Sequence, residues 1–312
     1  MWRKVNVIFK LKSPLHIGYL PFKGSVVSPT RYYVPGRSLW GAVTKRITEY
    51  LFKPSPKEED YRNIGKQIME NFRFSYFYIY DGETIYIPKF EGYRIKYGNI
   101  DRSEFENKFI GSRISTAIDP YSLTAKNESI HEIEFINEKF CDIDGDLKDV
   151  KIAGCIWIKE DTKINGKEAE INRGIIIDDF NVTHELIIGG EAKYGFGHVF
   201  LESINKINTK IPPFIWETPE EIEQDEFIIS HLKYDKSIKF EGDLELLSGR
   251  GYYDPKVIDN SESNISNAPG RIISRPEYYL SPGSRILSEN KRYILKWDGT
   301  LEVESGSVKI SM

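Results

Sequence analysis

The chain begins with alternating polar and apolar side chains. Residues 4–12 (KVNVIFKLK) have the two-residue period of a half-buried strand, which ends at Ser13-Pro14. In residues 38–52 the apolar positions recur at helical spacing, at Leu39, Val43, Ile47 and Leu51. Ser38 is the expected N-cap of this helix and Pro54 its stop. The pattern therefore predicts a strand, a loop and a helix.

Aromatic and β-branched runs follow the helix and indicate strands. Residues 72–80 and 83–88 flank Asp81-Gly82, which supplies the positive φ of a tight turn and predicts a β-hairpin. Residues 89–130 are polar and irregular, and a stretch of this length indicates a functional or mobile loop rather than core. Further strands are expected at 131–136, 150–158 and 198–204, and a helix near 179–188.

The order of these elements predicts an α+β fold of the ferredoxin-like (RRM-like) type with long inserted loops. Such a fold presents an open sheet suited to RNA, although it hosts many unrelated functions. The acidic, proline-containing stretch 208–226 is typical of a domain boundary. We therefore expect a first domain at 1–207, a linker at 208–226 and a smaller β-rich domain at 227–312.

Charge changes this picture because it is distributed unevenly. The 312-residue chain has a net charge of −4, yet residues 1–53 carry ten Lys and Arg against one acid, Glu49. A polyanion would meet this N-terminal region first, since Lys and Arg supply most sequence-independent affinity for phosphate. The alternative is that these residues form a solvated basic face without a ligand.

Cysteine usage and hydropathy exclude several classes of protein. Cys141 and Cys155 are the two cysteines, and they form no CxxC pair and have no histidine at ligand spacing. Neither a metal, a cofactor nor a disulfide framework is expected. No run of about 18 apolar residues could cross a membrane, and we find no signal peptide. A cytoplasmic protein is the expectation.

The segment IIGGEAKYGFGHV (187–199) is the strongest candidate for chemistry. It contains Gly189, Gly190, Gly195 and Gly197, and glycines this dense allow positive φ and expose amides that can hold phosphate oxygens. Lys193 adds charge, and Tyr194 or Phe196 could stack on a base or pack inward. The structural alternative is a helix C-cap followed by a bulged strand. The segment is neither a P-loop nor a dinucleotide-binding fingerprint.

The same segment resembles the C-terminal glycine-rich loop of the RAMP superfamily, the RNA-binding proteins of CRISPR systems. Three further stretches agree in order: LKSPLHIG (11–18), YVPGRSLWGAVTKRI (33–47) and the stretch 112–136, which is similar to the long loop and hairpin that type III members use beside guide and target RNA. YYLSPGSRI (278–286) resembles the close of a second ferredoxin-like unit in larger members. The resemblance implies a subunit of a type III effector complex in antiviral defence, with guide RNA, other subunits and target RNA as partners.

The resemblance also implies which residues grip the RNA backbone. In the glycine-rich loop these are Gly189, Gly190, Lys193, Tyr194, Gly195 and Gly197. At the first helix they are Gly36, Arg37, Ser38, Lys45 and Arg46. A helix N-terminus offers free N–H groups and a positive dipole to phosphate, which is consistent with the second set. For Leu39, Trp40 and Val43 we expect core packing.

Catalysis is not the favoured interpretation. RAMP subunits that cut target RNA place an acid in the loop after the first strand, whereas loop 19–33 contains no Asp or Glu. Asp119 is the nearest alternative carboxylate, although an Asp before Pro usually begins a turn. His16 is a weak candidate for general acid or base in a metal-independent endoribonuclease that processes repeat RNA, with Lys193 able to converge on it. A protein-interaction scaffold without RNA contact is the other alternative.

Overall fold

The computed structural model describes residues 1–18, 25–207, 209–223, 226–248, 276–287 and 292–304. It is a mixed α+β, strand-rich fold, as predicted, and the described residues form three α-helices: α1 (Gly36–Leu51), α2 (Glu58–Asn71) and α3 (Arg102–Phe109). Part of the loop expected at 19–33 (residues 19–24, with Lys23) and residues 208, 224 and 225 of the expected linker lie outside the described residues.

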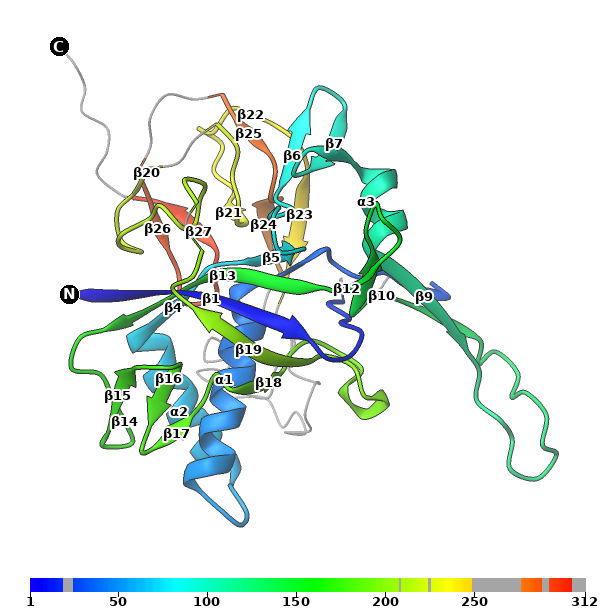
Figure 1. The fold of residues 1–312 in the computed structure, drawn as a ribbon, viewed down its shortest axis with the longest axis horizontal. Helices are drawn as coiled ribbons and strands as arrows, with labels where there is room; N and C mark the ends of the chain where they lie inside the picture. The colour runs from blue at the N-terminus through cyan, green and yellow to red at the C-terminus, as the bar shows by residue number, and fades with distance from the viewer. Residues whose placement is uncertain (19–24, 208, 224–225, 249–275, 288–291, 305–312) are drawn as a thin grey trace.

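A seven-stranded sheet forms the centre of the molecule (Figure 1). Its strands in spatial order are β18 (Glu185–Ile187), β19 (His198–Ile204), β1 (Trp2–Leu11), β13 (Lys151–Lys159), β5 (Phe77–Tyr80) and β3 (Tyr33–Val34), and β4 (Phe72–Phe74) also pairs with β13. The strand β1 lies between β13 and β19 and is antiparallel to both. The strands predicted at 4–12, 150–158 and 198–204 are confirmed.

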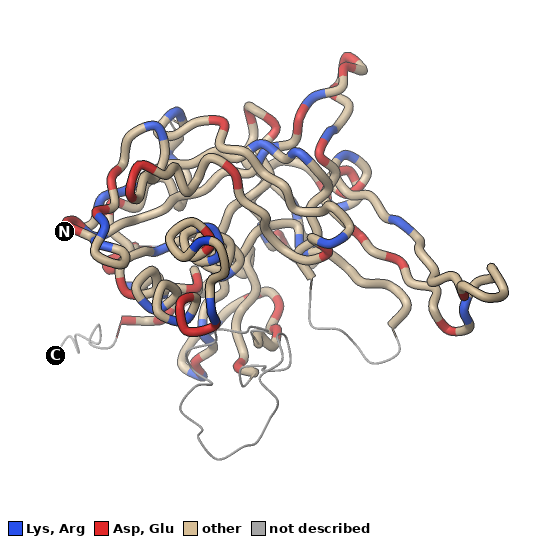
Figure 2. The backbone as a smooth tube through the Cα atoms, turned by 90° about the horizontal axis from the view of Figure 1, so that it is seen from below, with Lys and Arg blue, Asp and Glu red and all other residues tan. Residues whose placement is uncertain are grey.

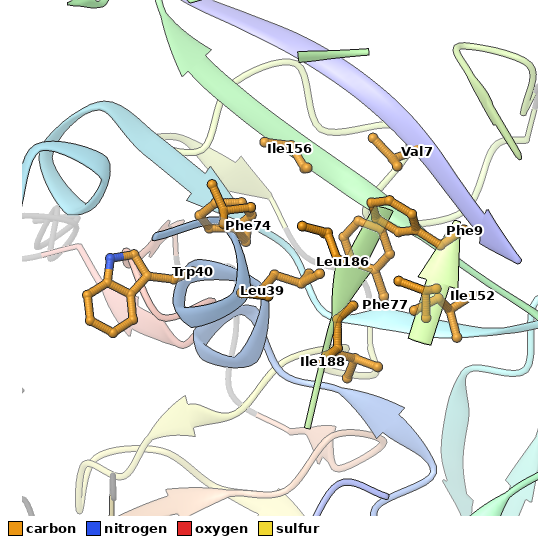
Figure 3. Packing of buried hydrophobic residues seen from close by; sticks show 14 of the residues in the cluster. Val7, Phe9, Leu39, Trp40, Phe74, Phe77, Ile152, Ile156, Leu186 and Ile188 are labelled. Atoms are coloured by element: carbon orange, nitrogen blue, oxygen red, sulfur yellow. The ribbon is translucent and has the colours of Figure 1, made fainter. Parts of the chain in front are cut away.

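Helices α1 and α2 cover one face of this sheet. The helical spacing seen in the sequence places Leu39, Val43 and Ile47 of α1 inside the molecule, as expected. They share a core with alternate residues of the strands, including Val7, Phe9, Phe74, Phe77, Ile152 and Ile156 (Figure 3). Fully burying a side chain of this size contributes about 1.5–3 kcal/mol. Helix α2 was not predicted, and its buried positions are Ile64, Gly65 and Ile68.

The predicted N-cap of α1 is wrong. The helix begins at Gly36, and its N-cap is Pro35, which makes no side-chain cap hydrogen bond. Ser38 lies inside the first turn, where its amide donates to the Pro35 carbonyl at 2.9 Å. Extended backbone at Pro35 (φ −62°, ψ 147°) and helical residues after it start the helix three residues earlier than the hydroxyl suggested.

The opposite face of the sheet is covered by the C-terminal part of the chain. Ala153, Cys155 and Trp157 of β13, with Tyr76 and Tyr78, share a second core with residues beyond 205, among them Trp216, Ile222, Leu232, Leu280, Leu295 and Leu301. The ring centroids of Trp157 and Trp216 lie 6.4 Å apart. The open sheet face that the fold class suggested is therefore occupied over β13 and β5 by the protein itself.

The C-terminal part forms a six-stranded sheet. In spatial order its strands are β20 (Ile222–Glu223), β26 (Arg292–Leu295), β27 (Leu301–Val303), β21 (Leu232–Lys233), β24 (Glu277–Leu280) and β23 (Leu244–Leu247), and β22 (Phe240–Glu241) pairs with β25 (Arg285–Ile286). Within the expected linker, Phe214, Trp216 and Ile222 are buried. The division into 1–207 and 227–312 stays a prediction.

The helix predicted near 179–188 is wrong. This stretch contains β17 (Phe180–Asn181) and β18, and it follows three short strands, β14 (Lys163–Ile164), β15 (Lys167–Ile171) and β16 (Ile175–Ile177). Asp178 and Asp179 have φ of 51° and 65°, which a right-handed helix excludes. The Thr183 hydroxyl accepts a hydrogen bond from the Ile175 amide at 3.0 Å, so the side chain supports a hairpin instead.

The expected hairpin and the loop after it are confirmed only in part. The turn at Asp81-Gly82 forms, with φ of 112° at Gly82 and a bridge between Tyr80 and Ile85. Residues 86–88 form no strand pair with residues 72–80. Residues 89–115 are ordered elements rather than irregular loop: β6 (Pro88–Glu91), β7 (Arg94–Tyr97), β8 (Ile100–Asp101), α3 and β9 (Ile110–Ser115). Phe105 and Phe109 of α3 are fully buried in an aromatic cluster, which a count of polar residues overlooks.

A projecting arm follows α3. Strand β9 pairs with β10 (His131–Ile136), a strand confirmed as predicted, and β10 also pairs with β2 (Val27–Ser28). We call β9, β10 and the segment that joins them the arm, and it extends away from the body of the molecule (Figure 1). The short strands β11 (Lys139–Cys141) and β12 (Leu147–Asp149) then lead into β13.

A buried polar network joins the central sheet to the C-terminal part. Glu245 of β23 accepts two hydrogen bonds from the Arg31 guanidinium, at 2.9 and 2.8 Å, and one from His231 Nε2. The opposite ring nitrogen of His231 accepts from the Tyr76 hydroxyl at 2.6 Å. Burial lowers the pKa of His231, which is fully buried. Burial alone would raise the pKa of Glu245, but His231 and Arg31 hold it at about 2.

We expect this network to make stability fall in acid. Both groups have a lower pKa in the folded protein, so the unfolded chain binds more protons and stability is lost as pH falls. For His231 the loss begins as pH falls below the ordinary value of 6.5, and for Glu245 it runs from 4.5 to about 2. Thermal unfolding followed by circular dichroism between pH 8 and 4 measures it.

His231→Gln should flatten the dependence of the unfolding midpoint on pH between pH 7 and 5. The matched control is His184→Gln, which changes an exposed histidine. A variant at His231 whose unfolding midpoint keeps the wild-type slope over that range would contradict the assignment.

Candidate nucleic-acid interface

The glycine-rich loop, residues 188–197, connects β18 to β19. Gly189, Gly195 and Gly197 have φ of 83°, 85° and 80°, a left-handed conformation that side chains rarely adopt. A short 3₁₀ turn, Ala192–Tyr194, lies at its tip, and the Ile188 amide donates to the Gly197 carbonyl at 2.9 Å to close it. The density of glycines in this segment therefore has a conformational cause.

The loop packs directly on the segment that follows β1. The amides of Gly190 and Gly197 donate to the carbonyls of His16 and Pro14 at 2.9 and 2.8 Å. A Cβ on Gly189 would lie 2.3 Å from the His16 oxygen, so the two backbones approach more closely than any side chain permits. These two amides stabilise the fold, whereas the sequence suggested that they face a phosphate. We call residues 14–18 the floor of the loop.

What the loop offers to a ligand is its tip. Lys193 is exposed, and Tyr194 is 71% exposed, whereas Phe196 is buried. The Phe196 ring contacts Phe135 of β10, with centroids 5.4 Å apart. Of the two aromatic residues considered for base stacking, Phe196 thus packs inward and Tyr194 is free to meet a base.

His16 connects the floor of the loop to β10 through its side chain. The ring is buried, and its Nδ1 lies 2.7 Å from the Glu134 carbonyl oxygen, which only accepts, so Nδ1 carries the proton. The ring lies against Gly190, whose Cβ position is 3.1 Å from His16 Cδ2. Although the two loops meet, no hydrogen bond or ion pair of the described residues joins His16 to Lys193.

The predicted gripping element at the start of α1 is covered. A Cβ on Gly36 would lie 2.5 Å from the Phe74 oxygen and 2.8 Å from Gly299 Cα, so the turn between β26 and β27 packs on the helix N-terminus. Arg37 lies with its guanidinium carbon 5.5 Å from the centre of the Trp297 ring. Gly36 and Arg37 therefore lie against the C-terminal part of the chain, and Ser38 next to them is half-buried.

Lys45 and Arg46 lie further along α1, beside the strand that leads into the glycine-rich loop. They line a shallow hollow with Ala42, Glu49, Glu185, Leu186 and Ile187. Lys45 is 3.8 Å from Glu49, and Arg46 is 4.0 Å from Glu185 and stacks over the Phe180 ring. Both cations are on the surface near the loop, but each has an acidic neighbour.

The basic N-terminal region does not form one basic face. Lys4, Lys10, Arg31, Lys45 and Arg46 each lie within 4.0 Å of a carboxylate. Lys4 and Arg31 reach Glu217 and Glu245, both more than 200 residues away in the chain. Lys, Arg, Asp and Glu are interspersed along the backbone (Figure 2). Four acids from outside residues 1–53, namely Asp149, Glu185, Glu217 and Glu245, thus offset part of the positive excess of this region.

The arm carries exposed apolar side chains that the sequence did not single out. Tyr121 and Leu123 at its far end are 96% and 79% exposed, and Ile114, Ile118 and Ile130 are also exposed. Asp119, the alternative carboxylate, accepts hydrogen bonds from the amides of Tyr121 and Ser122, which lower its pKa. Asp119 therefore acts as a turn residue.

Glu134 and Thr30 are site residues that the sequence gave no sign of. The Glu134 carboxylate accepts from the Thr30 amide at 3.2 Å while its carbonyl orients His16. The Thr30 hydroxyl in turn accepts from the Ile17 amide at 2.9 Å. These contacts join segments up to 118 residues apart, a separation that local pattern does not reveal.

The described residues contain no group of three or more His, Cys, Asp or Glu side chains that could hold a metal ion. No helix in the described part of the chain is both long and apolar enough to cross a membrane.

We expect glycine substitutions to separate close packing from conformational strain in the loop. Gly195→Ala should destabilise by about 1 kcal/mol, because its φ is positive but nothing lies within 4 Å of a new Cβ. Gly197→Ala should destabilise by about 2–4 kcal/mol, because its Cβ would also lie 2.0 Å from the Ile188 oxygen. Denaturant unfolding measures both, and equal losses would contradict the packing assigned to Gly197.

The chain is similar to known proteins in sequence and in structure. The family model of the RAMP superfamily matches residues 8–200, which include the end of β1, α1, the arm and the glycine-rich loop. No curated protein sequence matches the chain.

Solved structures of low sequence identity are similar to the chain. A chain of the Type III-B Cmr-beta complex bound to cognate target RNA has 12% identity and a TM-score of 0.48, with 91% of this chain and 86% of that chain covered. The complex with cognate target RNA and AMPPnP gives 11% and 0.49 with the same coverage. A chain of the Apo state gives 9% and 0.35, with 64% and 96% covered. At these TM-scores the likeness does not determine a shared function.

Proposed function

The chain belongs to the RAMP superfamily, and on that premise we propose that it is a non-catalytic RNA-binding subunit of a type III CRISPR effector complex that holds the guide RNA backbone. The observation that carries the proposal is the glycine-rich loop, fixed on the floor of residues 14–18 with Lys193 and Tyr194 exposed at its tip. A cation and an aromatic ring side by side are the pair that single-stranded nucleic acid uses for backbone and base contact.

The fold supports a contact at the loops rather than on the sheet. The strand order β19–β1–β13–β5, all antiparallel, with α1 between β1 and β4, is that expected of a ferredoxin-like unit. In RRM-type proteins RNA lies across the open face of such a sheet. Here the C-terminal part covers β13 and β5 on that side, so we assign the RNA contact to the tip of the glycine-rich loop and to the arm.

The arm supports a contact with a duplex or a neighbouring subunit. Its exposed Tyr121, Leu123, Ile114 and Ile118 have no core of their own, and exposed apolar side chains grouped on one element usually mark an interaction site. Because residues 112–136 resemble the hairpin that type III members use beside guide and target RNA, we propose the same neighbours for this arm. Partners of the chain would then be guide RNA, target RNA and other subunits.

We expect single-stranded RNA to bind through the loop tip. Lys193→Ala should weaken binding and reduce the slope of log affinity against log salt by about 0.7, the value for one lost phosphate contact. Tyr194→Leu should weaken binding about tenfold with little change in that slope, since stacking carries no charge. Fluorescence anisotropy with labelled RNA at several salt concentrations measures both effects.

Matched controls are available on other surfaces. Lys163→Ala removes a lysine that is 57% exposed on β14, and Tyr93→Leu removes a fully exposed tyrosine between β6 and β7. Neither should change RNA affinity by more than about twofold. Wild-type affinity that does not fall with rising salt, or loop variants that behave like these controls, would overturn RNA holding in favour of a protein scaffold.

We expect no metal-independent cleavage of CRISPR repeat RNA. His16 Nδ1 is engaged by the Glu134 carbonyl, and no hydrogen bond of the described residues couples the ring to a second histidine, a tyrosine or a lysine. Incubating the purified protein with labelled repeat RNA and a chelator should leave the RNA intact. Specific cleavage that His16→Ala abolishes would replace the holder with the endoribonuclease.

A further inference from the structure

Among the residues that the structure describes, Arg31 and Glu245 form the most buried ion pair that links the two parts of the chain. Arg31 is 6% exposed, and both of its terminal nitrogens donate to the two carboxylate oxygens of Glu245. This fork-to-fork geometry fixes the direction of the guanidinium as well as its charge. Arg31 is also close to the ring of Tyr33, to whose hydroxyl it donates at 2.9 Å.

Arg31 is part of the backbone that supports the floor of the glycine-rich loop. Its amide donates to the Ile17 carbonyl at 2.7 Å, and Thr30 beside it accepts from the Ile17 amide at 2.9 Å. Residues 30 and 31 therefore hold Ile17 from both of its backbone polar groups. The next residue back, His16, accepts the Gly190 amide of the loop.

A continuous chain of direct contacts thus runs from the C-terminal sheet to the candidate RNA site. The Glu245 carboxylate binds the Arg31 guanidinium, and the Arg31 amide donates to the Ile17 carbonyl. Ile17 is covalently joined to His16, whose carbonyl accepts from the Gly190 amide. The hydrogen bonds of this path join groups that are buried or part-buried, where loss of a partner costs folding free energy.

We propose that Glu245 is a positioning residue for RNA binding, which orients Arg31 and through it the floor beneath the glycine-rich loop, without touching RNA itself. The inference rests on the proposed function. It assigns the C-terminal part of the chain a role in shaping the RNA site of the N-terminal part.

The neighbouring cluster of Tyr76, His231 and Glu245 has the burial of an orienting network. Tyr76, His231 and Glu245 lie in hydrogen-bonded sequence like a nucleophile, base and acid, but Tyr76 and His231 are buried. Burial raises the pKa of the Tyr76 hydroxyl well above its usual value, so the tyrosine keeps its proton. The cluster therefore orients groups and does not activate them.

Long-range electrostatics and positioning predict opposite changes in RNA affinity for the variant Glu245→Gln. Removing a negative charge should strengthen the binding of a polyanion if Glu245 acts only through its charge. If Glu245 acts by orienting Arg31, Glu245→Gln should weaken RNA binding about fivefold or more. The matched control is Glu302→Gln on β27, which removes the same charge beside Lys233 and Lys296, and it should leave affinity unchanged or slightly tighter.

The experiment combines RNA affinity with hydrogen exchange of the free protein. Anisotropy titrations with single-stranded RNA are made on wild type, Glu245→Gln, Arg31→Lys, the double variant and Glu302→Gln. We expect Arg31→Lys to weaken binding although it keeps the charge, and the double variant to be no weaker than the worse single variant. Amide exchange in peptides covering residues 13–18 and 188–198 should rise in Glu245→Gln and stay at the wild-type rate in Glu302→Gln.

The outcomes distinguish this inference from the function on which it rests. Wild type that binds RNA, together with Glu245→Gln of equal or higher affinity, overturns the positioning role and leaves the proposed function standing. Wild type that shows no salt-dependent RNA binding overturns the function, while the exchange rates still decide whether Glu245 orders the floor. If Glu245→Gln does not fold, Arg31→Lys carries the same comparison, and unchanged exchange and affinity there overturn the inference.

Discussion

Strand β13 is buried on both of its faces, and the rest of the molecule is arranged around that constraint. Ile152, Ile156 and Ile158 face the helices, whereas Ala153, Cys155 and Trp157 face the C-terminal part. Gly154 between them allows Phe77 to approach, since a Cβ there would lie 2.4 Å from the ring. A strand with two apolar faces needs a layer on each side, because an exposed face of this size would leave large apolar side chains in water.

This double burial decides where a ligand can bind. With helices on one side and the β-rich C-terminal part over β13 and β5 on the other, the central sheet has no open face at these two strands. The tip of the loop that joins the edge strand β18 to its neighbour β19 remains exposed, and so does the arm beside it. The glycine-rich loop belongs to that edge, and its backbone is held by the segment after β1 rather than by its own side chains.

The C-terminal part therefore does more than cover apolar surface. A polar network within the second core joins Glu245 and His231 to Arg31, Tyr33 and Tyr76 across the layer boundary. Polar groups buried in this way must all be satisfied, so the network specifies one relative placement of the two sheets where apolar packing alone would tolerate small slips. Because Arg31 is next to the floor of the loop, this placement extends to the candidate RNA site.

The sequence by itself determined the local elements and the special backbone of the loop. Alternation along β1, helical spacing along α1 and the glycines at 189, 195 and 197 are local properties, since periodicity and positive φ are set by neighbouring residues. The tertiary structure alone decided what these residues face. Gly36, expected to grip a phosphate, instead packs on Gly299, and Lys4 and Arg31, expected to attract RNA, are paired with Glu217 and Glu245. Residues more than 200 positions apart meet only when a core brings them together, and no local pattern records which acid will neutralise which base.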